Sequence, residues 1–408
     1  MPSPAALRSA RIIAVLAVTQ VISWGTSFDM MGVMGRVIAA DLALPNEIIF
    51  FGLSLMMLVS ALAGPTTGRL LDRHGASKVL AAASIAFAIG LAILASSHEP
   101  IVYFLAWVVI GFAGSLGLTA PAYAAVVERE GLNGKRTIAI LMLFTGLSAT
   151  IFWPILTYFT GLIGWRMSFA FCAVLHILVC LPLHLFGLPR PEASAEAKRA
   201  AETAPVALEP AEKKRAFLYI AITTAIASFV SFGLSPSLLA LLQHAGASPA
   251  LALQLGSARG AIGVSARMVD MILGKRGNPL LTGLIGMSLM LLSFALLAVM
   301  PGHYPVLVGF MLLYGFGTGV VAVARALMPL SLFSAREYGL QAARLSMPQN
   351  LANAAAPVIF TAILDRVGFT ATVMTGAVLS AISLAFIVLL MGLVRRAQNR
   401  TPLAAAQA

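Results

Sequence analysis

Residues 68–78 read Gly-Arg-Leu-Leu-Asp-Arg-His-Gly-Ala-Ser-Lys, a short charged segment between two long apolar stretches. The flanking stretches, residues 47–70 and 79–97, are close to the roughly 20 residues that a helix needs to cross a bilayer. Gly75 permits a tight turn, and we expect Gly68 to let helices approach closely. The segment therefore predicts a charged loop between two membrane-spanning helices.

The composition of the whole chain agrees with a lipid environment. Of its 408 residues 60% are hydrophobic and only 10% are charged, and the mean hydropathy is +0.94. Soluble domains are about 25% charged. Because lipid offers the backbone no hydrogen-bond partner, the apolar stretches must be helices. We predict an all-α membrane protein with twelve transmembrane helices at 12–35, 47–70, 79–97, 101–126, 137–163, 166–187, 216–242, 249–272, 279–300, 304–329, 339–363 and 369–394.

One segment interrupts the apolar pattern. Residues 188–215 are polar, charged and rich in Ala and Pro, which is typical of a solvated linker. We therefore expect an N-terminal six-helix half over 1–187 and a C-terminal six-helix half over 216–408.

The two halves share a sequence pattern. Arg69-x-x-Asp72 after the second stretch returns as Arg267-x-x-Asp270 after the eighth. Parallel repeats of this kind place a binding site at the membrane midplane between the halves.

The net charge of +12 has a topological explanation. Of the 27 Lys and Arg residues, 22 lie in or next to the termini, the linker and the loops on one side, and three (Arg36, Arg166, Arg366) lie on the other. The positive-inside rule then puts both termini and the linker in the cytoplasm. We expect a monomer in the cell inner membrane, surrounded by lipid, and no nucleic-acid partner.

In this setting Gly68, Asp72, Arg73 and Gly75 resemble the loop signature of the major facilitator superfamily, although Ala76 replaces an expected basic residue. The resemblance implies a fold of two six-helix halves and transport by alternating access. It also implies a gating role for the loop, in which Asp72 caps a neighbouring helix N-terminus or pairs with an arginine of the other half. The alternative is that the loop charges are merely solvated. We assign Gly68, Asp72, Arg73, Gly75, Arg267, Asp270 and Arg325 to gating.

Arg259 is the most informative position. It lies ten residues after Pro249, or about 15 Å into the eighth helix, which is half the hydrocarbon thickness. A guanidinium fork suits a carboxylate. Monocarboxylate and oxalate porters of this superfamily are similar in placing an arginine on the eighth helix, but no membrane-embedded lysine accompanies it in the first or eleventh helix. The alternative is a structural arginine paired across the halves.

Asp29 is the only acidic residue well inside a predicted span. It shares a helical stripe with Gly25, Gly32 and Arg36, and it could couple transport to protons or form a structural pair. Further substrate-binding candidates lie on another face of the first helix and in other spans: Gln20, Trp24, Phe28, Tyr123, Asn350 and Asn353. These polar groups fit a cavity lining, or hydrogen bonds between helices. Arg325 either reaches for the membrane surface or serves as a gate.

The chain shows no phosphate-cradling loop, no nucleophile elbow and no metal-ligand spacing, so we expect neither an enzyme nor a cofactor. We predict a secondary active transporter of a small organic anion, coupled to protons, in which Arg259 holds the carboxylate. The alternative is proton-driven efflux of drugs or amphipathic metabolites.

Overall fold

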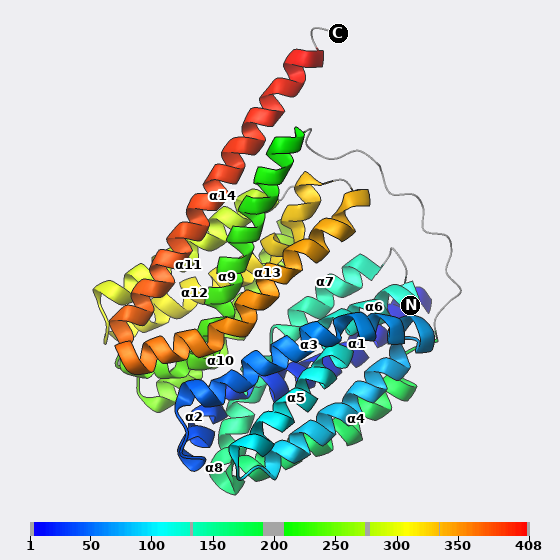
Figure 1. The fold of residues 1–408 in the computed structure, drawn as a ribbon, viewed down its shortest axis with the longest axis vertical. Coiled ribbons are helices and arrows are strands. Elements are labelled where there is room, and N and C mark those ends of the chain that lie inside the picture. The colour runs from blue at the N-terminus through cyan, green and yellow to red at the C-terminus, as the bar shows by residue number, and fades with distance from the viewer. Residues whose placement is uncertain (1–3, 131–133, 191–207, 274–277, 334, 406–408) are drawn as a thin grey trace. The chain divides into compact units, whose positions relative to one another are not determined.

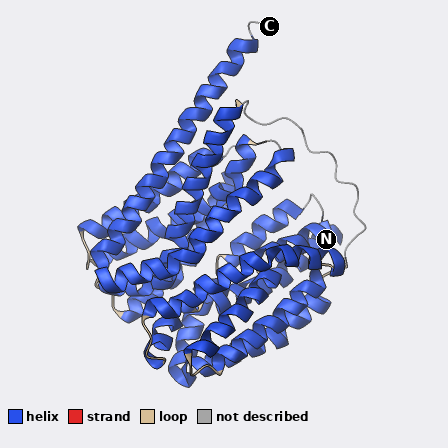
Figure 2. Ribbon diagram, viewed as in Figure 1, coloured by secondary structure: helices blue, strands red, loops and turns tan. Residues whose placement is uncertain are grey.

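The computed structural model describes residues 4–130, 134–190, 208–273, 278–333 and 335–405 (Figure 1). In these ranges the chain forms helices joined by short loops, and no strand is found there (Figure 2). The all-α prediction is therefore confirmed.

Contacts divide the chain into two units. Met1–Ala197 and Ser235–Leu239 form the amino-terminal unit, and Lys198–Leu234 and Ala240–Ala408 form the carboxy-terminal unit. Most of the predicted linker, residues 191–207, lies outside the described residues.

In the amino-terminal unit the first span is interrupted by a wider, π-helical turn, and η1 joins its two α-helices. Two further π-helical turns end the sixth span. The elements are α1 (Pro4–Trp24), η1 (Gly25–Asp29), α2 (Met31–Asp41), α3 (Asn46–His74), α4 (Ala76–Ala95), α5 (Pro100–Gly117), α6 (Thr119–Glu130), α7 (Gly134–Thr145), α8 (Ser148–Leu175), η3 (His176–Cys180) and η4 (Leu183–Gly187).

The carboxy-terminal unit has longer uninterrupted helices. They are α9 (Pro210–His244, of which Ser235–Leu239 group with the amino-terminal unit), α10 (Pro249–Leu273), α11 (Pro279–Val299), α12 (Tyr304–Leu332), α13 (Ala335–Ala362), η6 (Ile363–Val367) and α14 (Phe369–Ala405). Proline occupies the first or second position of α5, α9, α11 and α12, where its missing N–H leaves no hydrogen bond unmade.

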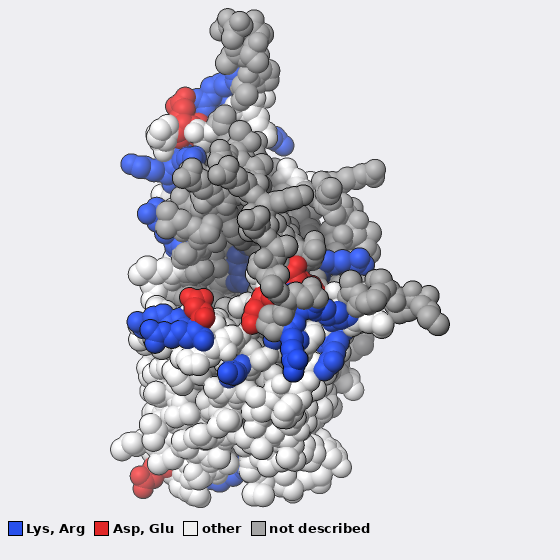
Figure 3. Space-filling view, turned by 90° about the vertical axis from the view of Figure 1, so that its right-hand side faces the viewer, with Lys and Arg blue, Asp and Glu red and all other residues white. Residues whose placement is uncertain are grey.

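Nine stretches of the described chain are long and apolar enough to cross a membrane. One of them, Arg136–Gly187, has 52 residues and contains two spans, because Gly164, with φ of 76°, breaks the helix. α10 and α13 are helical where spans are predicted, but they carry Arg259 and Asn350 among other polar residues and are not among the nine. The twelve predicted spans are thus helical, apart from short breaks such as those at Leu118 and at Gly146 and Leu147. On the face shown in Figure 3, a broad area without charged side chains has Lys, Arg, Asp and Glu at its edges, which fits a lipid-facing band.

Candidate functional site

The helix that carries Arg259 packs backbone to backbone against α12. A Cβ on Gly319 would lie only 2.4 Å from the carbonyl oxygen of Gly263, and a Cβ on Gly315 would lie 3.0 Å from the side chain of Ile262. Gly315 and Gly319 are four residues apart, which is the small-residue spacing that lets membrane helices approach closely. This contact places Arg259, one turn before Gly263, beside α12.

The Arg259 side chain reaches the hydroxyl group of Tyr314 on α12. Tyr314 is fully buried, stacks on Phe310 with ring centroids 5.5 Å apart, and its hydroxyl lies 3.5 Å from the Val230 carbonyl oxygen of α9. Arg259 itself is half-buried. A guanidinium has five N–H donors, more than one phenol oxygen can accept. The position therefore places a cation beside a buried hydroxyl group, half-way along a spanning helix.

Arg325, in the same unit, is bonded to α9. Its Nη1 donates to Ser228 Oγ of α9 at 2.8 Å. One turn earlier on α9, Thr224 Oγ1 accepts from Gln349 Nε2 of α13 at 3.0 Å and donates to the Ile220 carbonyl oxygen at 2.7 Å. These bonds connect α12 and α13 to the same face of α9.

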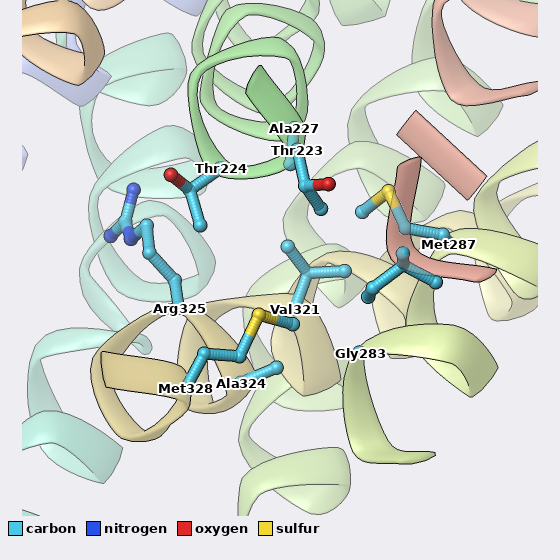
Figure 4. Close-up of a pocket in the computed structure, with 10 residues that line it drawn as sticks. Thr223, Thr224, Ala227, Gly283, Met287, Val321, Ala324, Arg325 and Met328 are labelled. Atoms are coloured by element: carbon cyan, nitrogen blue, oxygen red, sulfur yellow. The ribbon is translucent and has the colours of Figure 1, made fainter. Parts of the chain in front are cut away.

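A small pocket lies beside Arg325 (Figure 4). In the view, the Arg325 side chain extends from α12 toward Thr224 at one edge of the pocket. The centre of a water molecule can move within a volume of about 10 Å³ there, so the pocket holds about one water molecule. The pocket is therefore too small for an organic substrate. Its lining residues are Thr223, Thr224, Ala227, Gly283, Met287, Val321, Ala324, Arg325, Met328 and Ile387.

Asp29 is buried at the end of η1 and is held by α8. Ser148 Oγ donates to Asp29 Oδ2, and Trp153 Nε1 donates to the Asp29 carbonyl oxygen at 2.8 Å. The glycines of the predicted stripe provide the space, because a Cβ on Gly32 would lie 2.6 Å from the Trp153 ring and one on Gly25 would lie 2.2 Å from Phe152. The Asp29 stripe thus faces α8 inside the amino-terminal unit.

The other first-helix candidates lie on separate contacts. Gln20 is buried and its Nε2 donates to the Gly117 carbonyl oxygen at 2.7 Å, so it bonds α1 to α5. Phe28 is buried and meets the half-buried Trp24 edge to face, with ring centroids 6.1 Å apart. Tyr123 is half-buried and packs against a core cluster of α1, α4 and α6.

On α13, Asn350 is exposed and Asn353 is half-buried. The Asn353 Oδ1 atom is buried and accepts no hydrogen bond from the described part of the chain. An amide in this state has capacity for a further donor.

In the 68–78 loop, Gly75 makes the predicted turn, because its φ of 77° lies in the left-handed region and its N–H donates to the Leu71 carbonyl oxygen at 2.9 Å. The close helix approach expected at Gly68 is not found. No atom of the described chain comes within 4 Å of where its Cβ would be. Asp72 and Arg73 are exposed.

The cap at the amino end of α4 comes from a residue that the sequence did not single out. Glu128 Oε2, at the end of α6, accepts from the Ala76 N–H at 2.8 Å. Asp72 is therefore not the cap of this helix. In the second copy of the motif, Arg267 is half-buried, and Asp270 belongs to α10 with its side chain outside the described residues.

Arg129 is a second residue that sequence reasoning missed. It is only 4% exposed, and its guanidinium donates to the Pro189 and Ala125 carbonyl oxygens at 2.8 and 2.9 Å and to Ser77 Oγ at 2.6 Å. It thereby connects α6, α4 and the residues that follow η4. The signal was present as the Glu128-Arg129 pair, but loop charges of this kind also serve topology alone.

Comparison with known proteins identifies a family. The family model described as Major Facilitator Superfamily matches residues 16–300 and 220–407. Among curated proteins, no significant match was found.

Solved transporter structures share the fold along nearly the whole chain. A bacterial homolog of the human lysosomal transporter Spinster, in an inward-facing and occupied conformation, is 15% identical with a TM-score of 0.68, and the match covers 98% of each chain. The human organic anion transporter MFSD10 is 16% identical with a TM-score of 0.65, over 95% of this chain and 100% of that one. The nucleoside transporter NupG is 14% identical with a TM-score of 0.72, over 94% and 99%.

Proposed function

We propose that this chain, which belongs to the major facilitator superfamily, carries a small organic anion across the inner membrane by alternating access, coupled to protons. Membership of the family makes the chain a multi-pass membrane transporter of small molecules and not an enzyme. Its structural neighbours carry organic anions, peptides and nucleosides, according to their names. The substrate must therefore be inferred from this chain's own side chains.

The observation that carries the proposal is Arg259. A guanidinium half-way along a membrane-spanning helix costs several kcal/mol unless it faces water or a partner. This one is half-buried and shares the hydroxyl of a buried tyrosine, Tyr314. A carboxylate can accept a bidentate pair of hydrogen bonds from a guanidinium. A neutral substrate would gain only weaker hydrogen bonds from it, and a cationic substrate would be repelled.

Proton coupling is assigned to Asp29. Its carboxylate is buried, lies in the amino-terminal unit and accepts from the Ser148 hydroxyl. Ionisable residues inside membrane helices mark proton relays and ion pathways. A carboxyl group that gains and loses a proton during the cycle would link the anion's passage to the proton gradient.

The first experiment identifies the class of ligand. Purified protein is heated in detergent with a panel of mono- and dicarboxylates, neutral sugars and lipophilic cations, because a ligand that binds the folded state raises the unfolding temperature. We expect stabilisation by carboxylates alone. Stabilisation by the lipophilic cations alone would replace the proposal with efflux of amphipathic compounds.

The second experiment tests Arg259 itself. Arg259→Ala should lose carboxylate binding at a cost of about 2–5 kcal/mol, as expected for a charge-assisted contact. Arg259→Lys should also weaken it, because an ammonium cannot present a planar fork. Arg325→Lys is the matched control, because that arginine is bonded to Ser228 in the same unit. Folded Arg259→Ala protein that binds the carboxylate as wild type does would overturn the proposal.

The proposed orientation, with both termini in the cytoplasm, can be tested on one helix. Lys78 and Ser96 are exposed at opposite ends of α4. An impermeant thiol reagent added to intact cells should label Ser96→Cys and spare Lys78→Cys. The reverse pattern would invert the topology.

A further inference from the structure

Two helices of the carboxy-terminal unit are longer than a bilayer requires. α9 has 35 residues and α14 has 37, which at 1.5 Å per residue makes them roughly 52 and 55 Å long. The hydrocarbon core is only about 30 Å thick. In Figure 1 the first residues of α9 and the last residues of α14 run side by side past the other helices of their unit. Each helix thus leaves the hydrocarbon and continues as one of a pair.

Contacts along the two helices fix their antiparallel register. Ser383 Oγ donates to the Thr223 carbonyl oxygen at 3.1 Å, and the rings of Tyr219 and Phe386 lie 5.7 Å apart. At the far end, Arg400 Nη1 lies 2.8 Å from Glu209 Oε1. The register therefore places the residues just before Ala216 at the level of those around Val394.

Four exposed cations gather at this level. Lys214 and Arg215 come immediately before the apolar part of α9, and Arg395 and Arg396 come immediately after the apolar part of α14. The neighbouring Ala216 and Val394 are buried in one core cluster. We call Lys214, Arg215, Arg395 and Arg396 the basic collar. It lies where the helix pair emerges from the hydrocarbon.

The collar side chains are not paired with carboxylates of the described chain, although Arg215 interacts electrostatically with the nearby Glu212. The nearby carboxylates of Glu209 and Glu212 are both bonded to Arg400. Within the described residues, none of the four collar side chains forms a hydrogen bond or an ion pair. Basic residues at the corresponding end of the amino-terminal unit are used differently, because Arg8 and Arg11 donate to the carbonyl oxygens of residues 186, 187 and 190.

We propose that the basic collar binds the phosphate groups of anionic phospholipids in the adjacent leaflet. Clusters of four or more Lys and Arg directly beside a membrane span attract such headgroups, with about 1 kcal/mol for each cation. The position of the collar beside an apolar surface favours a lipid over a soluble partner. Leu218, one residue beyond Phe217 on α9, is 52% exposed and stands beside the collar, so a ligand there meets charge and an apolar surface together. An anionic lipid offers both a phosphate group and acyl chains, whereas a soluble acidic protein or a nucleic acid offers no acyl chain.

The experiment counts lipids bound to the intact chain. Purified protein is titrated with dioleoyl phosphatidylglycerol or, as the neutral comparison, dioleoyl phosphatidylcholine, and native mass spectrometry reports the number and affinity of bound lipids. The test variant combines Lys214→Gln, Arg215→Gln, Arg395→Gln and Arg396→Gln. One kcal/mol is about a fivefold change in affinity, so loss of four cations should weaken the tightest phosphatidylglycerol site by about 100-fold or more at low salt.

Two matched controls separate a site from general attraction. The first keeps the charge, with Lys214→Arg, Arg215→Lys, Arg395→Lys and Arg396→Lys, and should retain the affinity. The second removes four exposed cations elsewhere, with Arg73→Gln, Lys78→Gln, Arg136→Gln and Arg344→Gln, and should retain the tightest site.

The outcomes are distinct. Selective loss in the collar variant, together with wild-type affinity that falls as salt rises, supports the proposal. Equal loss in both Gln sets, or equal binding of the two lipids by wild type, overturns it, and so does retained affinity in the collar variant. If the collar variant is not a single folded species, the same test is made in two other ways. These are the salt dependence of lipid affinity in wild type and the lipid affinity of the single variants Arg395→Gln and Arg396→Gln.

Discussion

The contact between α10 and α12 offers the sharpest test of how the candidate anion site is built. A Cβ on Gly319 would lie 2.4 Å from the Gly263 carbonyl oxygen and 2.8 Å from its Cα. Ordinary van der Waals contact begins near 3.4 Å. Both obstructing atoms belong to the backbone, so no rotamer change can relieve the overlap. In Gly319→Ala the two helices must therefore separate by about 1 Å, at a cost of about 1–3 kcal/mol.

The matched control is Gly392→Ala on α14 of the same unit, where a Cβ meets nothing within 4 Å in the described structure. Alanine in an unobstructed helix position stabilises by about 0.4–1 kcal/mol, because it reduces the entropy of the unfolded chain. The same chemical change should therefore lower stability at Gly319 and raise it slightly at Gly392.

Thermal unfolding in detergent, followed by circular dichroism at 222 nm, measures both variants. Tryptophan fluorescence would be insensitive, because all four tryptophans belong to the amino-terminal unit. The Gly319→Ala protein should unfold several degrees below wild type, and it should also bind carboxylates more weakly, since α10 carries Arg259 away from Tyr314. An unfolding temperature at or above that of wild type would refute the packing argument.

Three further perturbations follow from contacts in the amino-terminal unit. Glu128→Gln should destabilise the protein by about 0.5–2 kcal/mol, because it weakens the charged cap of α4. The control Asp72→Asn changes an exposed side chain and should leave the unfolding temperature within about a degree of wild type. Equal effects of the two substitutions would contradict the capping role of Glu128. Arg129→Lys should lower the unfolding temperature despite its retained charge, because one ammonium cannot reach acceptors on three segments; wild-type stability would show that those bonds contribute little. Ser148→Ala should shift the pH profile of transport, because it removes the hydrogen bond to Asp29. Ser148→Thr keeps a hydroxyl group and should retain the wild-type profile. Identical profiles for wild type and both variants would remove Ser148 from the coupling site.

Much of the fold follows from apolar run length alone. Ten of the twelve spans lie in the nine apolar stretches of the described chain, so segment length and the cost of an unsatisfied backbone in lipid predict them. Gly75 and Gly164 also follow from local chemistry, because each adopts a φ above 70° at the end of a helix. The early start of α9, at Pro210, was not predicted. Its first residues are charged and form a capping box between Glu209 and Glu212, a local signal that hydropathy does not register.

The contacts of the candidate site could not be predicted from the sequence, and the reason is geometric. Helical periodicity placed Asp29 on a stripe with two glycines, but the partner that fills the glycine space, Trp153, is more than 100 residues away in the chain. The hydrogen bond between Arg325 and Ser228 likewise joins two residues that are 97 positions apart in the chain. A single sequence specifies which faces are small or polar; it does not specify which helix covers them.

Two spans of the carboxy-terminal unit, α10 and α13, are not among the nine apolar stretches of the described chain. α10 and α13 carry arginine, glutamine and asparagine at depths where these groups are costly unless they meet protein, water or ligand. Within the described carboxy-terminal unit the structure supplies part of the answer: Arg259 meets Tyr314, and Gln349 meets Thr224. The Asn353 Oδ1 atom, buried on α13 and accepting no hydrogen bond from the described residues, has no such compensation. Because polar groups are retained at this cost, we expect α10 and α13 to contribute side chains to the proposed anion site.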